Sequence, residues 1–196
     1  GHESEQVKES MQGQGLIFVE QTEQLGTGHA VVQCHDELNT GNDILVLYGD
    51  VPLIKETTLS ALIAKGRQNN VVCLLSFDAI DPTGYGRIVR DNEGLVTAIV
   101  EEKDASEDIR QIKESNSGIL YIKGTEYREL LAELDADNAQ QEYYLTDVVK
   151  HAVARNHNVD AVICTDESEV LGVNNQQQLA EVESIYRLSG ANQLMT

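Results

Sequence analysis

Short apolar runs alternate with longer stretches of helical period along this chain. Runs rich in Val, Ile and Leu that end at turn residues are typical of strands, and apolar positions three and four residues apart are typical of helices that cover a sheet. Strands are expected at 16–20, 43–48, 71–77, 118–122 and 159–164, and helices at 28–38, 56–68, 125–134, 146–155 and 176–188. The alternation predicts an α/β fold with a mixed, mostly parallel sheet.

The centre of the chain has a different pattern. Residues 86–90 and 95–101 are expected to form a β-hairpin, because the turn sequence Asp-Asn-Glu-Gly at 91–94 separates two apolar runs. This hairpin is what makes the predicted sheet mixed. Thr146 is the candidate N-cap of the helix that begins there, and Asn175 is the candidate N-cap of the last helix.

Composition narrows the class of protein. A length of 196 residues fits one domain, and 41% hydrophobic with 24% charged residues is typical of a globular protein. The formal net charge of -19 argues against nucleic-acid and membrane partners, because both carry negative charge. Cys34, Cys73 and Cys164 are too far apart for a disulfide framework or a zinc cluster, so the expected location is cytoplasmic.

The run at 45–53 is an apolar strand that ends in a carboxylate, Asp50. Ligands of open α/β sheets bind at strand ends, and a hard oxygen there suits Mg²⁺, which completes its shell with water and substrate phosphates. Gly49 permits close backbone approach, and Asn174 would be a second, neutral oxygen ligand. The alternative is an Asp that only starts a turn.

Residues 21–30 follow a predicted strand and open a helix, which is the arrangement of a nucleotide site. Gly26 and Gly28 expose backbone N–H groups there, and Gln21 offers both a donor and an acceptor for a base edge. A short Gly-x-Gly is weak by itself, so a turn followed by a helix cap is the alternative.

Two more positions suit a sugar. Gly86 would present a backbone amide from the loop at 81–88 to a sugar or an acyl amide, and Glu101 would accept hydrogen bonds from sugar hydroxyls at a strand end. Asn116 begins a strand. The alternatives are an ordinary β-turn at 81–88 and a solvated charge run at 100–103. The polar aromatic patch at 142–147 would either close over a sugar or only start a helix.

The histidines give no support to nucleophilic catalysis of the triad kind. His29, His35, His151 and His157 have neither metal-ligand spacing nor a serine or cysteine partner. We interpret them as structural residues.

Taken together, these segments resemble one family, the bacterial bifunctional N-acetylglucosamine-1-phosphate uridylyltransferases and glucosamine-1-phosphate acetyltransferases. The resemblance extends over nearly the whole chain and is specific in combination. It is carried by the segments Glu23–Ala30, Tyr48–Leu53, Asp81–Ile88, Ile99–Ala105, Asn116–Ile119, Glu142–Asp147 and Gly172–Asn175.

The resemblance implies a Rossmann-like nucleotidyltransferase fold and a Mg²⁺-dependent enzyme that converts UTP and N-acetylglucosamine-1-phosphate into UDP-N-acetylglucosamine and pyrophosphate. Asp50 would be the catalytic residue, and Asp50 with Asn174 would hold Mg²⁺. The substrate contacts it implies are Gln21, Gly26 and Thr27 for the uridine nucleotide, Tyr48 and Gly49 beside the metal, and Gly86, Glu101, Asn116 and Asn174 for the N-acetylglucosamine moiety.

Two parts of the family's pattern have no counterpart in this sequence: the opening strand with its glycine-rich, triphosphate-holding loop, and the hexapeptide-repeat acetyltransferase domain. We therefore expect a single truncated domain, 1–196, that lacks its first strands and has weak or no activity alone. Its bared sheet edges favour a homo-oligomer or a strand-swapped dimer. The alternative functions are a nucleotidyltransferase for another hexose-1-phosphate and a non-catalytic sugar-nucleotide binding module.

Overall fold

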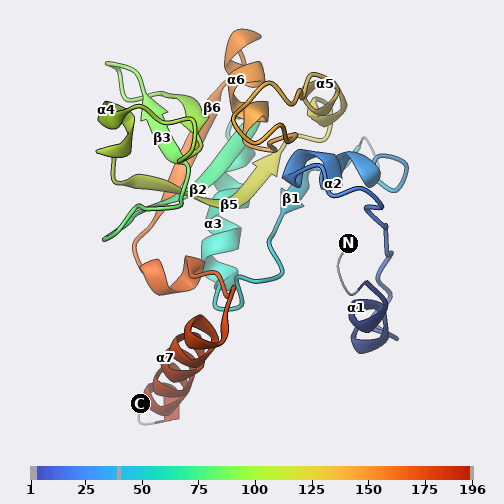
Figure 1. Ribbon diagram of the computed structural model, residues 1–196, viewed down its shortest axis with the longest axis vertical. Helices are drawn as coiled ribbons and strands as arrows, with labels where there is room; N and C mark the ends of the chain where they lie inside the picture. Colours follow the sequence, from blue (N-terminus) through green and yellow to red (C-terminus); the bar gives the residue numbers. More distant parts are fainter. Residues whose placement is uncertain (1–3, 39–40, 195–196) are drawn as a thin grey trace.

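The computed structural model of this protein describes residues 4–38 and 41–194. The strands it describes form one sheet in the order β4-β3-β5-β2-β6, with β1 lying beside β5 off this path (Figure 1). They are β1 (Ile44–Val46), β2 (Val72–Asp78), β3 (Arg87–Arg90), β4 (Val96–Val100), β5 (Glu114–Ile122) and β6 (Val159–Cys164).

The helices lie between these strands and at both ends of the chain. They are α1 (Ser4–Ser10), α2 (Thr27–Gln33), α3 (Glu56–Gly66), α4 (Glu107–Arg110), α5 (Tyr127–Ala132), α6 (Asp147–Ala154), the 3-10 helix η1 (Glu167–Val170) and α7 (Gln176–Leu194). Each long apolar run that predicts an element, apart from the one at 16–20, lies in a strand or helix of the predicted type. The α/β class and the central hairpin are therefore confirmed.

Strand β2 is buried on both faces, which is why its sequence is a continuous apolar run. Val72 and Leu74 belong to a core that includes α5 and α6, whereas Cys73, Leu75 and Phe77 belong to a second core that includes Leu62 of α3. Since side chains alternate between faces along a strand, both faces of β2 are covered by helices. Fully burying a residue such as Leu contributes about 1.5–3 kcal/mol, so β2 and β5 anchor the domain.

The strand directions differ from the prediction. The sheet is mixed, as expected, but of the described pairings only β2 with β6 is parallel, whereas β1, β2 and β3 each run antiparallel to β5 and β3 runs antiparallel to β4. The expectation of a mostly parallel sheet was wrong because an apolar run reports burial of both faces, which helices on either side produce for both directions.

The strand expected at 16–20 is absent. Leu16, Ile17, Phe18 and Val19 lie in irregular backbone with exposed fractions of 49%, 69%, 42% and 38%. A strand needs a neighbour to share its hydrogen bonds, and no described strand pairs with this segment. Helix α1 is exposed in the same way as this segment. None of its residues is buried, and the helix projects from the body of the domain (Figure 1).

Helix starts differ in how they are capped. Asn175 accepts a hydrogen bond from the Gln178 backbone N–H at 2.9 Å, which confirms it as the N-cap of α7. Thr146 does precede α6, but its side chain makes no capping bond and instead donates to Glu101 Oε1 at 2.9 Å. Helix α2 also ends at Gln33, earlier than the predicted residue 38, and turns continue the chain.

Candidate functional site

Two adjoining cavities lie where the loops after β1, before β3 and after η1 meet the middle of β5. The first has a volume of about 310 Å³ and the second about 240 Å³. Both are lined by Tyr48, Gly84, Tyr85 and Ser117, so they form one continuous hollow. Such a position beside strand ends is where α/β sheets bind small ligands.

Asp50 and Asn174 converge in the first cavity although they are far apart in sequence. The Asp50 carbonyl oxygen accepts a hydrogen bond of 2.8 Å from the Val173 N–H, which holds the two loops together. A Cβ placed on Gly172 would lie 3.6 Å from Asn174 Nδ2 and 3.7 Å from Asp50 Oδ2. The two side chains therefore face the same small space above Gly172, which a larger residue would fill.

This donor set fits Mg²⁺ rather than a metal held by protein alone. Mg²⁺ keeps most of its water or substrate oxygens and takes one or two protein oxygens, and a carboxylate with a side-chain amide supplies such a pair. Over residues 4–38 and 41–194, no three His, Cys, Asp or Glu side chains gather in a metal-binding group. A cation at Asp50 and Asn174 would depend on a ligand's oxygens to complete its shell.

Tyr48 lines both cavities and packs against a bend in β5. A Cβ on Gly118 would lie 2.5 Å from Tyr48 Cε2, and Gly118 has a φ of +84°, so only glycine suits this position. Burial raises the pKa of the Tyr48 hydroxyl, a hydrogen bond with Thr27 lowers it, and the charges of Glu101 and Asp50 raise it. Tyr48 is therefore a neutral hydrogen-bonding group at neutral pH.

Glu101 lines the second cavity. Its Oε1 accepts from the Thr146 hydroxyl at 2.9 Å, and a Cβ on Gly86 would lie 3.3 Å from both of its carboxylate oxygens. Burial raises the pKa of Glu101, the Thr146 hydrogen bond lowers it, and the nearby charges of Asp104 and Asp147 raise it. The carboxylate can accept hydrogen bonds from a ligand hydroxyl, and such bonds would stabilise its buried negative charge.

Asn116 and Gly86 complete the wall beside Glu101. Asn116 is buried, with 7% of its surface exposed, and its Oδ1 accepts from the Gly118 N–H at 3.1 Å. Its own N–H donates to the Gly86 carbonyl at 2.8 Å, so the start of β3 is held against β5. All three predicted sugar contacts of this wall thus line one cavity.

The predicted nucleotide loop is fastened to the segment before α6. The Tyr143 N–H donates to Leu25 O and the Gly28 N–H donates to Tyr143 O, both at 2.8 Å, while Thr27 Oγ1 accepts from the Leu145 N–H at 3.1 Å. Thr27 lines the second cavity. These bonds bring the start of α2 beside Glu101 and its neighbours.

Gln21 and Gly26 shape this loop from within. Gln21 Nε2 donates to Gly26 O at 3.0 Å and lies 3.1 Å from His29 Nδ1. Gly26 has a φ of +109°, and a Cβ there would lie 2.7 Å from Tyr143 O. The structural interpretation of His29 fits these contacts, since its other ring nitrogen lies 3.1 Å from Gln33 Nε2.

Gly49 lies outside the two cavities named above. It borders a third, apolar cavity of about 440 Å³ next to β1, and a Cβ on it would meet nothing within 4 Å. Protein atoms therefore do not demand glycine here. Its assignment as a substrate contact stays a prediction.

Some cavity residues were not singled out from the sequence. Tyr85 and Ser117 line both cavities, and Gln178 of α7 reaches the first. Gly118 gave an available signal, because a glycine inside an apolar strand often marks a bend or a close approach. Tyr85 packs edge-on against Phe77 with ring centroids 5.0 Å apart, which no local pattern foretells.

Comparison with known proteins assigns the family. The sequence model of the nucleotidyl transferase family matches residues 2–182. The chain is 48% identical over 195 residues to the bifunctional protein GlmU of Saccharophagus degradans, 50% over 195 residues to that of Stutzerimonas stutzeri, and 45% over 195 residues to that of Methylococcus capsulatus. These alignments cover 100% of this chain and 43%, 43% and 42% of the relatives, so the chain spans less than half of their length.

The family description agrees with the α/β sheet and with a polar hollow at its strand ends. A match over residues 2–182 covers most of the 196 residues, including every element from α2 to η1. This chain belongs to the nucleotidyl transferase family.

Proposed function

We propose that this chain is the uridylyltransferase part of an enzyme that makes UDP-N-acetylglucosamine and pyrophosphate from UTP and N-acetylglucosamine-1-phosphate. The observation that carries the proposal is the convergence of Asp50 and Asn174 above Gly172, in a hollow that continues to Glu101 and Asn116. One end offers oxygen ligands beside a space for phosphates, and the other offers hydrogen-bonding groups for a sugar. The relatives' name, bifunctional protein GlmU, supports this assignment.

The attacking group in this reaction is a phosphate oxygen that is already an anion, so no general base is required. The protein has to align that oxygen with the α-phosphorus of UTP and offset the charge that gathers there. Asp50 and Asn174 would hold Mg²⁺, which supplies part of that charge compensation when bound. Glu101, Asn116 and Gly86 orient the sugar, and Thr27, Gly26 and Gln21 present the nucleotide.

Two alternatives keep specific support. A related enzyme for another hexose-1-phosphate would share the Asp50 site, because a fold does not determine its substrate. A non-catalytic sugar-nucleotide binding module would show the same hollow without turnover. The chain matches only 43% of its relatives' length, so binding and turnover are separate questions for it.

Calorimetric titration with UDP-N-acetylglucosamine in Mg²⁺ tests the proposal. We expect saturable binding that Asp50→Asn and Glu101→Gln each weaken at least about tenfold, since each removes a charged partner of the ligand or its metal. Asp160→Asn is the matched control, because Asp160 pairs with Lys65 at 2.7 Å near the start of β6, outside the hollow. Equal affinity for UDP-glucose or GDP-mannose would contradict the proposed substrate.

A coupled assay for pyrophosphate, with UTP and N-acetylglucosamine-1-phosphate, decides between enzyme and binding module. Turnover that Asp50→Asn abolishes supports a catalytic domain. Saturable binding with no pyrophosphate release favours a module that binds without catalysis, or a domain that depends on segments outside this chain.

We also propose that the chain self-associates, as a homo-oligomer or strand-swapped dimer, through the outer edge of β1. Within the described residues β1 pairs only with β5, and β1 lines an apolar cavity together with residues such as Val31, Leu38 and Leu145. The exposed apolar segment 16–19 is a suitable occupant of that edge.

We propose a cytoplasmic location on two observations. None of the described helices has the length and apolar character needed to cross a membrane. Cys34, Cys73 and Cys164 are free thiols, and two of them are buried, as suits a reducing compartment.

A further inference from the structure

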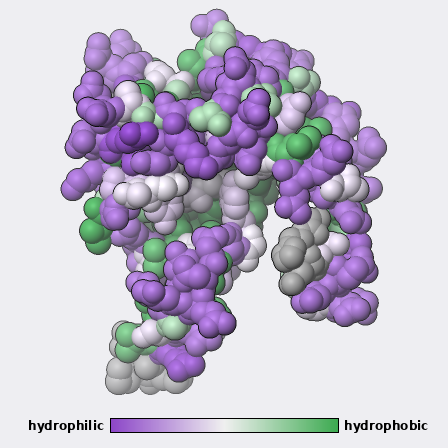
Figure 2. Space-filling view, viewed as in Figure 1, coloured by the Kyte–Doolittle hydropathy of each residue, from purple (hydrophilic) through white to green (hydrophobic). Residues whose placement is uncertain are grey.

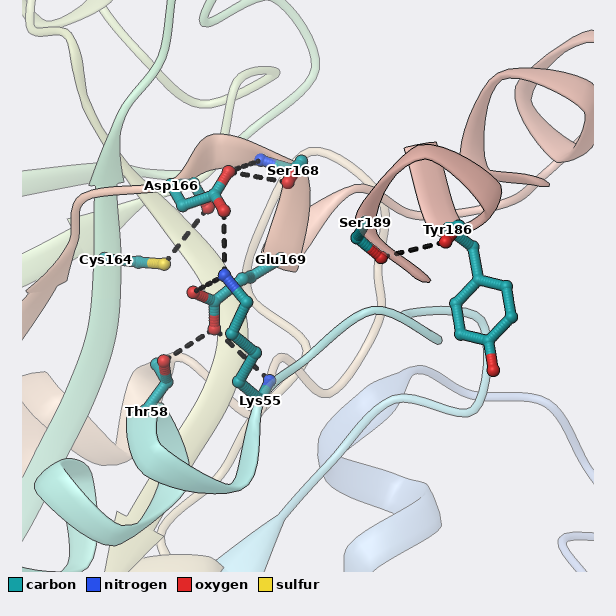
Figure 3. Close-up of polar contacts among 8 residues, drawn as sticks. All are labelled: Lys55, Thr58, Cys164, Asp166, Ser168, Glu169, Tyr186 and Ser189. Carbon is teal, nitrogen blue, oxygen red and sulfur yellow. Dashed lines mark hydrogen bonds and ion pairs between the residues drawn. The ribbon is translucent and has the colours of Figure 1, made fainter. Parts of the chain in front are cut away.

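A buried carboxylate, Glu169, contacts Lys55 and Thr58 at the start of α3 (Figure 3). Its side chain is 7% exposed and lies in η1, directly before the Asn174 loop. It accepts hydrogen bonds from the Lys55 backbone N–H at 3.2 Å, from Lys55 Nζ at 3.0 Å and from the Thr58 hydroxyl at 2.5 Å. A carboxylate is retained in such a place only when it is paired and hydrogen-bonded, as Glu169 is.

Lys55 extends the cluster to a second acid. Lys55 Nζ lies 2.9 Å from Asp166 Oδ2, and Asp166 Oδ1 accepts from the Ser168 N–H and hydroxyl at 3.2 and 2.6 Å. The hydrogen bond from Lys55, followed by that from Ser168, lowers the pKa of the Asp166 carboxyl. One lysine is thus shared by two carboxylates, and the end of β6 is tied to the segment that begins α3.

The cluster is placed symmetrically with respect to the proposed metal ligands. Lys55 follows Asp50 by five residues, and Glu169 precedes Asn174 by five residues. Between them, Val51 and Val170 are buried in one hydrophobic core, and the Val173 N–H donates to the Asp50 carbonyl at 2.8 Å. Three contacts therefore join the two loops: the ion pair of Lys55 with Glu169, the packing of Val51 and Val170 in one core, and the backbone hydrogen bond beside the proposed ligands.

From this arrangement we infer that Glu169 is a positioning residue, which with Lys55 and Thr58 clamps the Asp50 loop onto the Asn174 loop and so sets the spacing of the two metal ligands. The inference rests on the proposed Mg²⁺ site. Glu169 itself touches neither cavity, and its effect passes through the backbone of both loops. Partners that orient metal ligands typically change metal affinity by about 10–100-fold when they are removed.

Hydrogen exchange of the Val173 amide tests the clamp without any metal. In Glu169→Gln, which removes the charge, and in Thr58→Val, which removes one hydroxyl at similar volume, Val173 should exchange at least about tenfold faster relative to the amides of β2. Asp160→Asn is the matched control, because it also neutralises an acid paired with a lysine of the α3 region but joins no loop of the site. If Val173 exchanges at an unchanged relative rate in both Glu169→Gln and Thr58→Val, the inference is overturned.

Mn²⁺ titration followed by electron paramagnetic resonance is the second measurement. Glu169→Gln should raise the Mn²⁺ dissociation constant at least about tenfold, and Asp160→Asn should leave it unchanged within about twofold. If Asp50→Asn weakens Mn²⁺ binding and Glu169→Gln does not, the clamp is wrong and the metal site stands. If Asp50→Asn has no effect, or if the unsubstituted chain binds no Mn²⁺, the proposed metal site is wrong, and the Val173 exchange still decides whether Glu169 holds the loops.

Discussion

Glu101 carries a negative charge where the folded protein disfavours it. Burial raises its pKa, and the charges of Asp104 and Asp147 add to that effect against the lowering by Thr146. The folded state therefore holds the proton more tightly than the unfolded chain, whose Glu pKa is about 4.3. As the pH rises from there through the folded pKa, the free energy of unfolding falls, and the ionised carboxylate opposes folding at neutral pH.

We therefore predict that Glu101→Gln separates stability from ligand binding. At pH 7 its urea midpoint should equal or exceed that of the unsubstituted chain, whereas the affinity for UDP-N-acetylglucosamine should fall at least about tenfold. The stability of Glu101→Gln relative to the unsubstituted chain should increase from pH 4 upwards, because Glu101 ionises and the glutamine that replaces it does not. Urea unfolding at several pH values measures it.

Glu102→Gln is the neighbouring control for this prediction. Glu102 pairs at 2.6 Å with Arg87, whose side chain is 2% exposed, so its neutralisation leaves a buried cation without its counter-charge. This variant should be destabilised by about 3 kcal/mol or more. A Glu101→Gln chain that loses as much stability as Glu102→Gln would refute the interpretation.

At the scale of elements, the join between the start of α2 and the segment before α6 depends on Gly26. Its φ of +109° and the 2.7 Å from a Cβ to Tyr143 O leave no room for a side chain. Gly26→Ala should cost about 1–3 kcal/mol for the backbone conformation and a further ~1–3 kcal/mol for the overlap. The substitution should also displace Thr27 from the cavity that Gly86, Glu101 and Asn116 line, so the affinity for the sugar nucleotide should fall.

Gly94 provides the matched comparison for that loss. It has a φ of +83° in the β3–β4 turn, but a Cβ there would meet nothing within 4 Å. Gly94→Ala should therefore show only the conformational cost and leave binding intact. Equal urea midpoints for the two variants would show that the contact with Tyr143 carries no energy.

The elements show which parts of the fold a sequence pattern predicts. The central strands were predicted correctly because helices cover both of their faces, and burial on both sides leaves an unbroken apolar run. The run at 16–20 has the same pattern but lies exposed in irregular backbone, because a pattern reports apolar character and not the presence of a neighbouring strand. The prediction of strand directions was wrong for a related reason, because direction depends on how the elements are connected and not on their apolar character.

The candidate site was predictable in its chemistry and not in its assembly. Asp50 at a strand end and Asn174 before a helix each give a local signal, but the 2.8 Å bond from Val173 to Asp50 arises from the topology that places the two loops together. Thr146 illustrates the limit, because its sequence position suggests a cap while a distant carboxylate takes its hydroxyl. Gly118 and Tyr85 act through packing partners far along the chain.

Charge governs the molecule as a whole. Hydrophilic side chains cover most of the face shown in Figure 2, and the formal net charge is -19. Copies of such a chain repel one another over about 10 Å at 0.1 M salt, and over less at higher salt. Any self-association through a short apolar edge has to exceed this repulsion, so it should strengthen as ionic strength rises.

Light scattering after size-exclusion chromatography tests the proposed association through β1. We expect a dimer fraction that rises with protein concentration and with salt, and that Ile17→Lys abolishes, because Ile17 lies in the exposed segment 16–19 with 69% of its surface accessible. Leu188→Lys on α7, with 64% exposed, is the control: it changes the net charge equally and so reduces the repulsion by the same amount. Loss of the dimer in Ile17→Lys alone assigns the contact to the edge segment. A monomer for the unsubstituted chain at every concentration and salt would refute self-association, and equal loss in both variants would place the contact elsewhere.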